Sequence, residues 1–415
     1  MRDGTVYVIG AGLAGLSAAT ALAEQGRRVE IFEATPQAGG RCRSYFDPQL
    51  DQVIDNGNHF VLSGNHATMR FLGRTDARKG LVGPAKAGVA CVDIRSGKRW
   101  AIAPNDGPIP FWLFDRTRRV PDTRASDYVE IAKLLMVGRD RPLRDVLSCT
   151  GLLWDRLFEP FFVGALNTAP ESASAALASA LVRETFAKGG GAYRIRIAHP
   201  TLASVFVEPA LAYLGSREAR VHFGQRVRQI VSDERGVIAL ALPERTLPVS
   251  PADTVIVAVP PWAASELLPG IAAPDEFRSI VNAHFKLPAP SGTPLMLGVI
   301  GGTAQWIFSF PDRISVTISN ADALVNDDRE VLARTIWDDV KKALELTAPL
   351  PPWQIVKEKR ATFAATPEQA AKRAQTVTRW PNLLLAGDWT ATGLPATIEG
   401  AIRSGHKAAE TALRR

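Results

Sequence analysis

The chain has 415 residues, of which 46% are apolar, and its 49 Lys/Arg against 42 Asp/Glu give a net charge of +7. This length and composition suit two globular domains with a sizeable core. The cysteines Cys42, Cys91 and Cys149 are far apart and form no CxxC pair or Cys/His cluster, which argues against a disulfide scaffold or a metal site. The charge is not accompanied by a recognisable nucleic-acid-binding module, so we expect no nucleic-acid partner.

The first 34 residues carry a phosphate-binding pattern. "TVYVIGAGLAGLSAATALAEQGRRVEIFEA" predicts a buried strand, a helix and a second strand that ends at Glu33. Gly10 permits a tight turn, Gly12 lets the backbone approach a pyrophosphate, and Gly15 lets the helix pack on the strand. The free N–H groups at the helix start attract phosphate. Glu33 would bind a ribose diol and repel a 2′-phosphate, which argues against NADP.

A second glycine motif follows the acid. "ATPQAGGRCRS" places Gly39, Gly40 and Arg41 six to eight residues after Glu33. The glycines allow another close backbone approach, and Arg41 can pair with a phosphate oxygen. This pair followed by Arg resembles the extended dinucleotide fingerprint of flavoproteins in the amine oxidase and carotenoid desaturase superfamily. The alternative is an ordinary glycine-rich loop with a surface arginine, but beside the first motif the pattern favours FAD.

The excess charge concentrates in residues 66–100, which hold eight Lys/Arg and only two acidic residues. Shortly afterwards, "PIPFWLFDRTRR" (residues 108–119) places four large apolar side chains beside three arginines. Aromatic residues flanked by arginines suit an anionic membrane surface. The alternative is a solvated basic face beside a buried aromatic cluster.

Two stretches in the second half predict antiparallel strands. Residues 221–244 alternate and turn at Arg235-Gly236 as in a β-meander, and "ADTVIVAVPP" then predicts a buried strand. Residues 287–311 are uncharged and long enough to span a bilayer, but they contain four prolines and four glycines. We therefore expect a β-hairpin around Gly301-Gly302, with an aromatic face formed by Trp306, Phe308 and Phe310.

The C-terminal segment "LLLAGDWTATGLPATIEGAIRSG" repeats the arrangement of a strand, an acid and a helix start. Asp388 lies just beyond a buried strand, where ligands of open α/β sheets collect, and could bind ribityl hydroxyls. A helix beginning near Thr397 would direct its positive end at the flavin pyrimidine ring. FAD has two ends, which explains why the chain builds two such units. The alternative is a second βα unit without a ligand.

These motifs, with "DNGNHFVLSGN" (55–65) and "IVNAHFKL" (280–287), resemble the squalene-associated FAD-dependent desaturases of hopanoid biosynthesis. The resemblance runs from the first strand to the final helix. It implies an α/β fold similar to amine oxidases and phytoene desaturases. A discontinuous Rossmann-like FAD-binding domain (1–65, 200–275 and 376–415) would carry an inserted α+β substrate-binding domain (66–199 and 276–375).

The resemblance also implies the cofactor and its ligands. FAD would be bound non-covalently, since no cysteine after Cys149 is available for attachment through a C-terminal thiol. The backbone at Val227 would contact the adenine. The residues expected to bind FAD are Gly10, Gly12, Leu13, Ala14, Gly15, Glu33, Ala34, Gly39, Gly40, Arg41, Asn58, Val227, Gly387, Asp388, Thr397 and Ile398.

The implied reaction removes the allylic hydroxyl of hydroxysqualene, a triterpene lipid, and gives squalene with reduced FAD as hydride donor. His59 is the candidate acid for the leaving oxygen, with His284 or Asp55 second. A buried histidine is more often structural, and we assign His199 and His222 that role.

The N-terminus lacks the apolar stretch of a signal peptide, so we expect a cytoplasmic protein with peripheral contact to the inner face of the membrane.

Three alternatives remain open at this level. A carotenoid-type desaturase would use the same FAD site to remove hydride from a polyisoprenoid. An amine oxidase-like enzyme would be expected to place an aromatic cage at the flavin, and residues 380–400 show no clear Tyr pair. A non-enzymatic flavin-binding scaffold would need no polar side chains at the flavin face.

Overall fold

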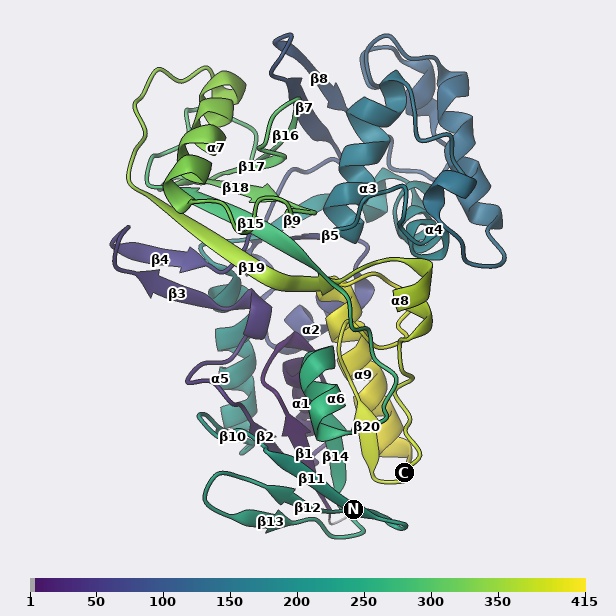
Figure 1. Ribbon diagram of the computed structural model, residues 1–415, viewed down its shortest axis with the longest axis vertical. Helices are drawn as coiled ribbons and strands as arrows, with labels where there is room; N and C mark the ends of the chain where they lie inside the picture. Colours follow the sequence, from purple (N-terminus) through teal and green to yellow (C-terminus); the bar gives the residue numbers. More distant parts are fainter. Residues whose placement is uncertain (1–3) are drawn as a thin grey trace.

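A parallel five-stranded sheet forms one end of the structure, a computed structural model that describes residues 4–415 (Figure 1). Residues 1–3, the start of the segment expected to lack a signal peptide, lie outside the described residues. The strands come from three separate stretches of the chain and bury their apolar side chains on both faces, as parallel strands do. Their order is β10 (Arg220–His222), β2 (Arg28–Phe32), β1 (Thr5–Ile9), β14 (Thr254–Val257) and β20 (Leu383–Leu385).

Different layers cover the two faces of this sheet. Val6 and Val8 of β1 pack with three helices, which are α1 (Leu13–Glu24), α5 (Glu208–Ser216) and α9 (Ile398–Arg414). Tyr7 and Ile9 point to the other face, where they join the cluster of the β-meander and α6 (Pro261–Leu267). The predicted meander is confirmed as β11 (Gln229–Asp233), β12 (Gly236–Ala241) and β13 (Thr246–Pro248).

A mixed seven-stranded sheet forms the second large layer, and helix α7 (Arg329–Leu344) packs against it. The predicted apolar hairpin is confirmed, because β16 and β17 pair antiparallel around Gly301-Gly302. Within residues 4–415, no helix is long and apolar enough to cross a membrane. The strand order is β19 (Trp353–Phe363), β15 (Phe277–Phe285), β18 (Ile314–Ile318), β17 (Trp306–Ser309), β16 (Met296–Ile300), β7 (Val89–Asp93) and β8 (Lys98–Ile102).

Smaller elements complete the fold. Two small sheets contain β3 (Ser44–Asp47) with β4 (Gln52–Asp55), and β5 (Phe60–Leu62), β9 (Ile195–Ala198) and β6 (Leu81–Val82). The remaining α-helices are α2 (His66–Arg74), α3 (Glu159–Leu166), α4 (Ala175–Glu184) and α8 (Pro367–Ala371). Short 3₁₀ and π turns occupy Gly40–Cys42, Arg78–Gly80, Phe111–Phe114, Ala125–Met136, Leu143–Asp145, Trp154–Phe158, Phe186–Lys188, Gly190–Ala192 and Ala203–Val207.

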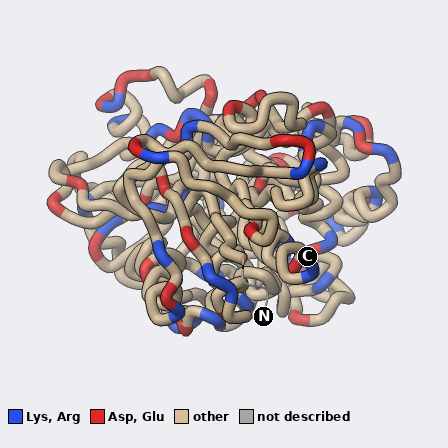
Figure 2. The backbone as a smooth tube through the Cα atoms, turned by 90° about the horizontal axis from the view of Figure 1, so that it is seen from below, with Lys and Arg blue, Asp and Glu red and all other residues tan. Residues whose placement is uncertain are grey.

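Charged residues of both signs are distributed over the molecule. Figure 2 shows basic and acidic residues interspersed along the chain. Within the basic stretch 66–100, Arg74 pairs with Glu24 at 2.9 Å and Arg99 pairs with Glu345 at 2.8 Å. The Arg74 side chain is only 7% exposed, whereas both partners of the Arg99–Glu345 pair are exposed. Exposed pairs of this kind contribute little to stability.

Helix α9 returns the end of the chain to the first βα unit at very short range. A Cβ at Gly405 would lie 2.2 Å from the carbonyl oxygen of Ala14 in α1. Gly405 therefore packs helix α9 directly against helix α1.

We expect Gly405→Ala to lower the free energy of unfolding by about 1–3 kcal/mol, because the added methyl would force α9 away from α1. Gly215→Ala in α5 is the matched control, since its Cβ would meet no described atom within 4 Å. That control should be neutral or stabilising by up to ~1 kcal/mol. Urea unfolding of both variants checks this, and equal stabilities would contradict the close approach.

Candidate active site

The three glycines of the first motif have three different surroundings. Gly10 has φ +105°, which favours glycine, and a Cβ at Gly15 would lie 1.9 Å from the Gly10 carbonyl oxygen. The tight turn and the close helix–strand packing are therefore both present. A Cβ at Gly12 would meet no described atom within 4 Å, so no described protein atom fills the space in front of the start of α1.

The second glycine motif lies directly against this space. Gly39 has φ +106°, and its N–H donates to the Ala11 carbonyl at 2.8 Å. The nearest described atom to a Cβ at Gly40 would be the Gly12 Cα, at 3.5 Å. Both loops thus present bare backbone to the same place, which fits a pyrophosphate approached from two sides.

Glu33 ties the end of β2 to the glycine loop. Its carboxylate accepts hydrogen bonds from the Ala11 N–H at 2.8 Å and from the Thr35 N–H at 2.9 Å. The connection that carries the buried Val227 lies close to this point, since the Gln225 N–H donates to the Glu33 carbonyl at 2.9 Å. Glu33 and Val227 are thus placed near one end of the candidate site, while the exposed Ala34 points to solvent.

Arg41 and Asp388, predicted separately as cofactor ligands, meet each other. Arg41 Nη2 lies 2.7 Å from Asp388 Oδ1, and Arg41 Nη1 donates to the Ala361 carbonyl at 2.5 Å. Asp388 is buried just beyond β20, where the C-terminal motif predicted it. Their roles toward phosphate and ribityl groups stay predictions.

Helix α9 starts where the sequence predicted. Thr397 caps it by accepting a hydrogen bond from the Gly400 N–H at 3.0 Å, and Ile398 is the first helical residue. The Gly387 N–H donates to Ser404 Oγ at 2.8 Å, which fixes the loop before the helix. Leu13 and Ala14 occupy the matching buried positions in the first turn of α1.

Two charged residues that support this region were missed by sequence reasoning. Arg373 is buried, and its guanidinium donates to the carbonyl oxygens of Asp388 (3.0 Å), Trp389 (3.3 Å) and Thr390. Burial lowers the pKa of Arg373 to about 10, and Asp388 opposes this shift. Glu399 accepts from the backbone N–H of Thr68 at 2.9 Å and thereby caps α2. No local pattern identifies either partner.

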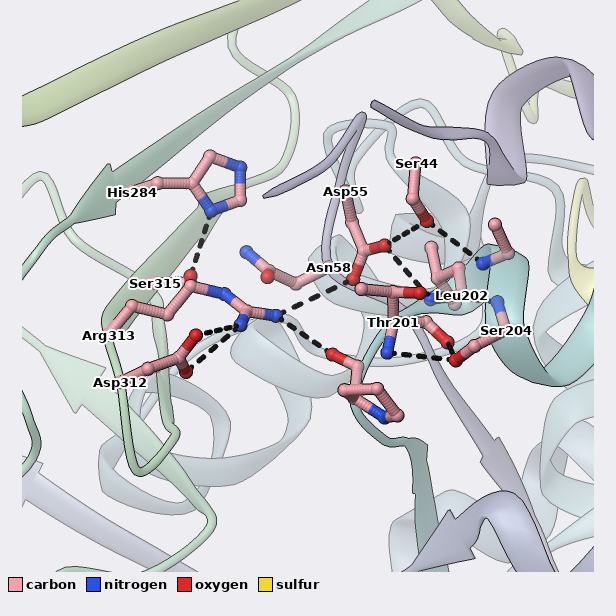
Figure 3. Close-up of polar contacts among 12 residues, drawn as sticks. Ser44, Asp55, Asn58, Thr201, Leu202, Ser204, His284, Asp312, Arg313 and Ser315 are labelled. Atoms are coloured by element: carbon pink, nitrogen blue, oxygen red, sulfur yellow. Dashed lines mark hydrogen bonds and ion pairs between the residues drawn. The ribbon is translucent and has the colours of Figure 1, made fainter. Parts of the chain in front are cut away.

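The loop of "DNGNHF" is anchored by a buried acid (Figure 3). Asp55 accepts hydrogen bonds from Ser44 Oγ at 2.5 Å and from the Leu202 N–H at 2.9 Å. The buried Arg313 lies 3.8 Å away and also pairs with Asp312 at 3.1 Å. Burial raises the pKa of Asp55, and these three partners oppose that shift.

A second polar cluster joins the same loop to the seven-stranded sheet. Asn58 donates through its side chain to Thr317 Oγ1 at 3.1 Å and through its backbone to Asn282 Oδ1 at 3.4 Å. Thr317 Oγ1 also donates to Asn282 Oδ1 at 2.7 Å. All three residues are buried. Asn58 therefore holds the loop in place, and Asn282 of the "NAHF" segment is its counterpart on β15.

The two candidate histidines differ in exposure and partners. His284 is fully buried, and its Nδ1 lies 2.8 Å from Ser315 Oγ (Figure 3). Burial, with a smaller contribution from Arg313, lowers its pKa to about 3. His59 is only half-buried and makes no hydrogen bond with the described residues. Burial and the nearby Arg41 lower its pKa to about 4.

The other assigned histidine roles can be compared with the structure. His222 stacks on Phe32, with ring centroids 4.9 Å apart, and its Nε2 lies 3.0 Å from Glu30, so it is a structural residue as expected. His199 lines a surface cavity of about 350 Å³ with Leu295 and Phe310. Among residues 4–415, no group of three His, Cys, Asp or Glu side chains could hold a metal ion.

An apolar cluster begins immediately after His59. Strand β5 starts at Phe60 and pairs with β9, and these strands pack on Phe308 and Phe310 of the predicted aromatic face. Trp306 packs on the edge of the same cluster. The cavity of about 350 Å³ adjoins it through Phe310. The strand that follows His59 therefore packs on an apolar cluster, and the role of this cluster toward a substrate stays a prediction.

Comparison with known proteins identifies the class that this fold and site define. The model of the flavin containing amine oxidoreductase family matches residues 13–413, and the chain belongs to this family. Two solved structures share the fold across nearly their whole length. Cyclohexylamine oxidase from Brevibacterium oxydans is similar with a TM-score of 0.72, 19% identity and 100% coverage of both chains. A putative protoporphyrinogen oxidase from Exiguobacterium gives 0.71 and 17% identity, covering 100% of this chain and 99% of that one.

Closer relatives narrow the class. The chain is 50% identical over 410 residues to a hydroxysqualene dehydroxylase of Rhodopseudomonas palustris, covering 99% of this chain and 98% of that protein. It is 46% identical over 407 residues to the hydroxysqualene dehydroxylase of Zymomonas mobilis, covering 98% of each. The predicted family resemblance and the amine oxidase-like α/β fold are confirmed.

We expect Gly12→Val to abolish FAD binding without destabilising the FAD-free protein. Gly12 has φ −72° and ψ 176°, an extended conformation open to β-branched residues, and a Cβ there would meet no described atom within 4 Å. Affinity for added FAD should fall at least about a hundredfold, or about 2.8 kcal/mol.

Flavin fluorescence titration and thermal unfolding of the FAD-free protein provide the two readouts. Gly215→Ala, whose Cβ also meets no described atom within 4 Å, should keep normal FAD affinity. Unchanged FAD binding in Gly12→Val would place the cofactor elsewhere.

Proposed function

We propose that this protein is an FAD-dependent hydroxysqualene dehydroxylase, which reduces hydroxysqualene to squalene. The observation that carries the proposal is the near 50% identity, over almost the whole length, to relatives named for this activity. The two-sided glycine cradle and the apolar cluster that packs against β5, the strand after His59, support it.

In this proposal FAD is held non-covalently at the joined motifs. Gly12, Gly39 and Gly40 would receive the pyrophosphate, and Arg41 would contribute positive charge to it. Asp388 and the start of α9 would face the ribityl chain and the pyrimidine edge. Burial raises the pKa of Cys42 to about 12, which keeps this neighbouring thiol protonated and unreactive and supports non-covalent binding.

The reaction consumes one proton and one hydride. The proton joins the leaving hydroxyl, the C–O bond breaks with release of water, and the allylic carbon is left as a delocalised cation. When bound in its reduced form, FAD supplies the hydride that forms the new C–H bond. The chain must deliver the proton, orient the allylic carbon and exclude other water that would recapture the cation.

His59 is our candidate proton donor. Asp55 is hydrogen-bonded to protein groups, and His284 is fully buried with only its Nε2 unbonded, whereas the half-buried His59 makes no hydrogen bond with the described residues. His59 also lies at the start of the strand that leads into the apolar cluster.

A triterpene of this kind resides in membranes, so we also propose cytoplasmic location with peripheral contact to the inner face of the membrane.

The first test is a single-turnover reaction without oxygen. The FAD-loaded protein is reduced chemically, hydroxysqualene is added, and flavin reoxidation is followed while the product is extracted. We expect one squalene for each flavin reoxidised. Persistence of reduced flavin without squalene would refute the proposal, and the oxidised enzyme would then be tested for reduction by a polyene precursor.

The role of His59 predicts a pH dependence for the same reaction. With a pKa of about 4, the protonated fraction of His59 grows about tenfold for each unit that pH falls. The single-turnover rate should therefore rise between pH 8 and pH 6. His59→Gln should lose this slope while still binding FAD, whereas the control His222→Gln should keep it. A rate independent of pH in the unsubstituted protein would remove His59 as the acid.

A further inference from the structure

Large apolar side chains are exposed in one segment more than elsewhere. Among the described residues, 14 large apolar side chains are exposed, and half of them lie in residues 109–152. We call this segment the helical lobe. Its five most exposed apolar side chains are Met136 (80%), Phe114 (77%), Val129 (67%), Phe111 (65%) and Ile109 (60%).

The short helical turns of the lobe are apolar on two sides. Trp112 and Tyr128 point inward and stack edge to face, with centroids 5.5 Å apart, and the Val120 N–H donates to the Tyr128 hydroxyl at 3.0 Å. The neighbouring Phe111 and Val129 point outward. The lobe thus has its own core, and its outer apolar side chains make no contribution to that core. Exposed apolar side chains gathered in one segment favour an interaction site there.

Acidic and basic side chains of the lobe differ in how many partners they have. The segment contains eight Lys/Arg and six Asp/Glu. Several of its acids are bound within the protein: Asp140 accepts from Ser174 Oγ at 2.7 Å, and Glu130 accepts from the Ser148 N–H at 2.9 Å. By contrast, the exposed guanidinium groups of Arg116 and Arg139 have no partner among residues 4–415.

The position of the lobe suits surface docking. In Figure 1 it lies at the end of the molecule opposite to the parallel sheet and to the chain termini. If the protein docked through the lobe, the parallel sheet and the helices around it would therefore not touch the docking partner.

We infer that the helical lobe docks this protein onto anionic lipid bilayers, with Phe111, Phe114 and Met136 entering the headgroup region and Arg116 and Arg139 facing anionic headgroups. Exposed aromatic residues combined with unpaired arginines match this surface, because each basic residue contributes about 1 kcal/mol near an anionic membrane. The inference rests on the proposed function for the reason to visit a membrane, but lipid binding itself requires neither FAD nor substrate.

The test is co-sedimentation of the FAD-loaded full-length protein with vesicles of phosphatidylcholine alone or with phosphatidylglycerol. We expect binding to the anionic vesicles that weakens with salt. Phe111→Ser/Phe114→Ser/Met136→Ser should bind at least about tenfold more weakly. Arg116→Glu/Arg139→Glu should lose the preference for phosphatidylglycerol. Phe46→Ser/Val331→Ser is the matched control, since both side chains are 59% exposed elsewhere, and it should bind normally.

Equal vesicle binding by the lobe variant and the control variant would overturn the inference. So would light scattering that shows a dimer of the unsubstituted protein converted to a monomer by the lobe substitutions, because the patch would then bind a second copy. The single-turnover assay with detergent-dispersed hydroxysqualene separates the two proposals. Vesicle binding without squalene formation would refute the proposed activity alone, and squalene formation without vesicle binding would refute the docking surface alone.

Discussion

The close approach of α9 to α1 is the contact on which the two halves of the candidate site depend. It requires the missing side chain of Gly405, since any Cβ there would reach the Ala14 carbonyl at 2.2 Å. At this distance the loop before α9 can place Asp388 beside Arg41, although the two residues are 347 positions apart. A motif at the end of the chain thus completes one at its beginning. The glycines therefore act on the site through backbone distance as well as through their conformational freedom.

Buried polar groups set the position of the third part of the site. The Asp55 carboxylate accepts hydrogen bonds from Ser44 and Leu202 and lies 3.8 Å from Arg313. Asn58 is hydrogen-bonded to Asn282 and Thr317. Removing one member of such a network leaves the polar group of another member buried without a hydrogen bond. Because this is costly in free energy, the network constrains the loop strongly. His59 lies one residue beyond Asn58. Its placement at the start of the apolar cluster thus follows from side chains that make no contact with the reaction itself.

Local patterns predicted the elements well, and distant contacts were what they missed. The G-x-G-x-x-G turn, the meander, the hairpin at 296–309 and the start of α9 each depend on residues close in sequence, so their glycines and alternation are sufficient signals. Arg373 and Glu399 act on backbone atoms of another element, and nothing in "AAKRAQ" or "TIEGA" identifies those atoms. The pairing of Arg41 with Asp388 was missed for the same reason. The exposure of apolar residues such as Phe111 and Met136 was also not predictable from local sequence, because it depends on how the lobe folds.

The charge distribution around the site agrees with chemistry that passes through a cation. The half-buried Arg41 pairs with Asp388 at 2.7 Å, the buried Arg313 pairs with Asp312 at 3.1 Å, and the buried Arg373 donates to the neutral carbonyls that follow β20. An unpaired positive charge would raise the energy of a carbocation, because Coulomb repulsion is strong in a poorly solvated space. It would also depress further the pKa of His59, which already falls to about 4 beside Arg41. The pairing of Arg41 with Asp388 therefore serves both steps of the proposed reaction, since it limits the depression of the pKa of His59 and weakens the repulsion of a nearby cation.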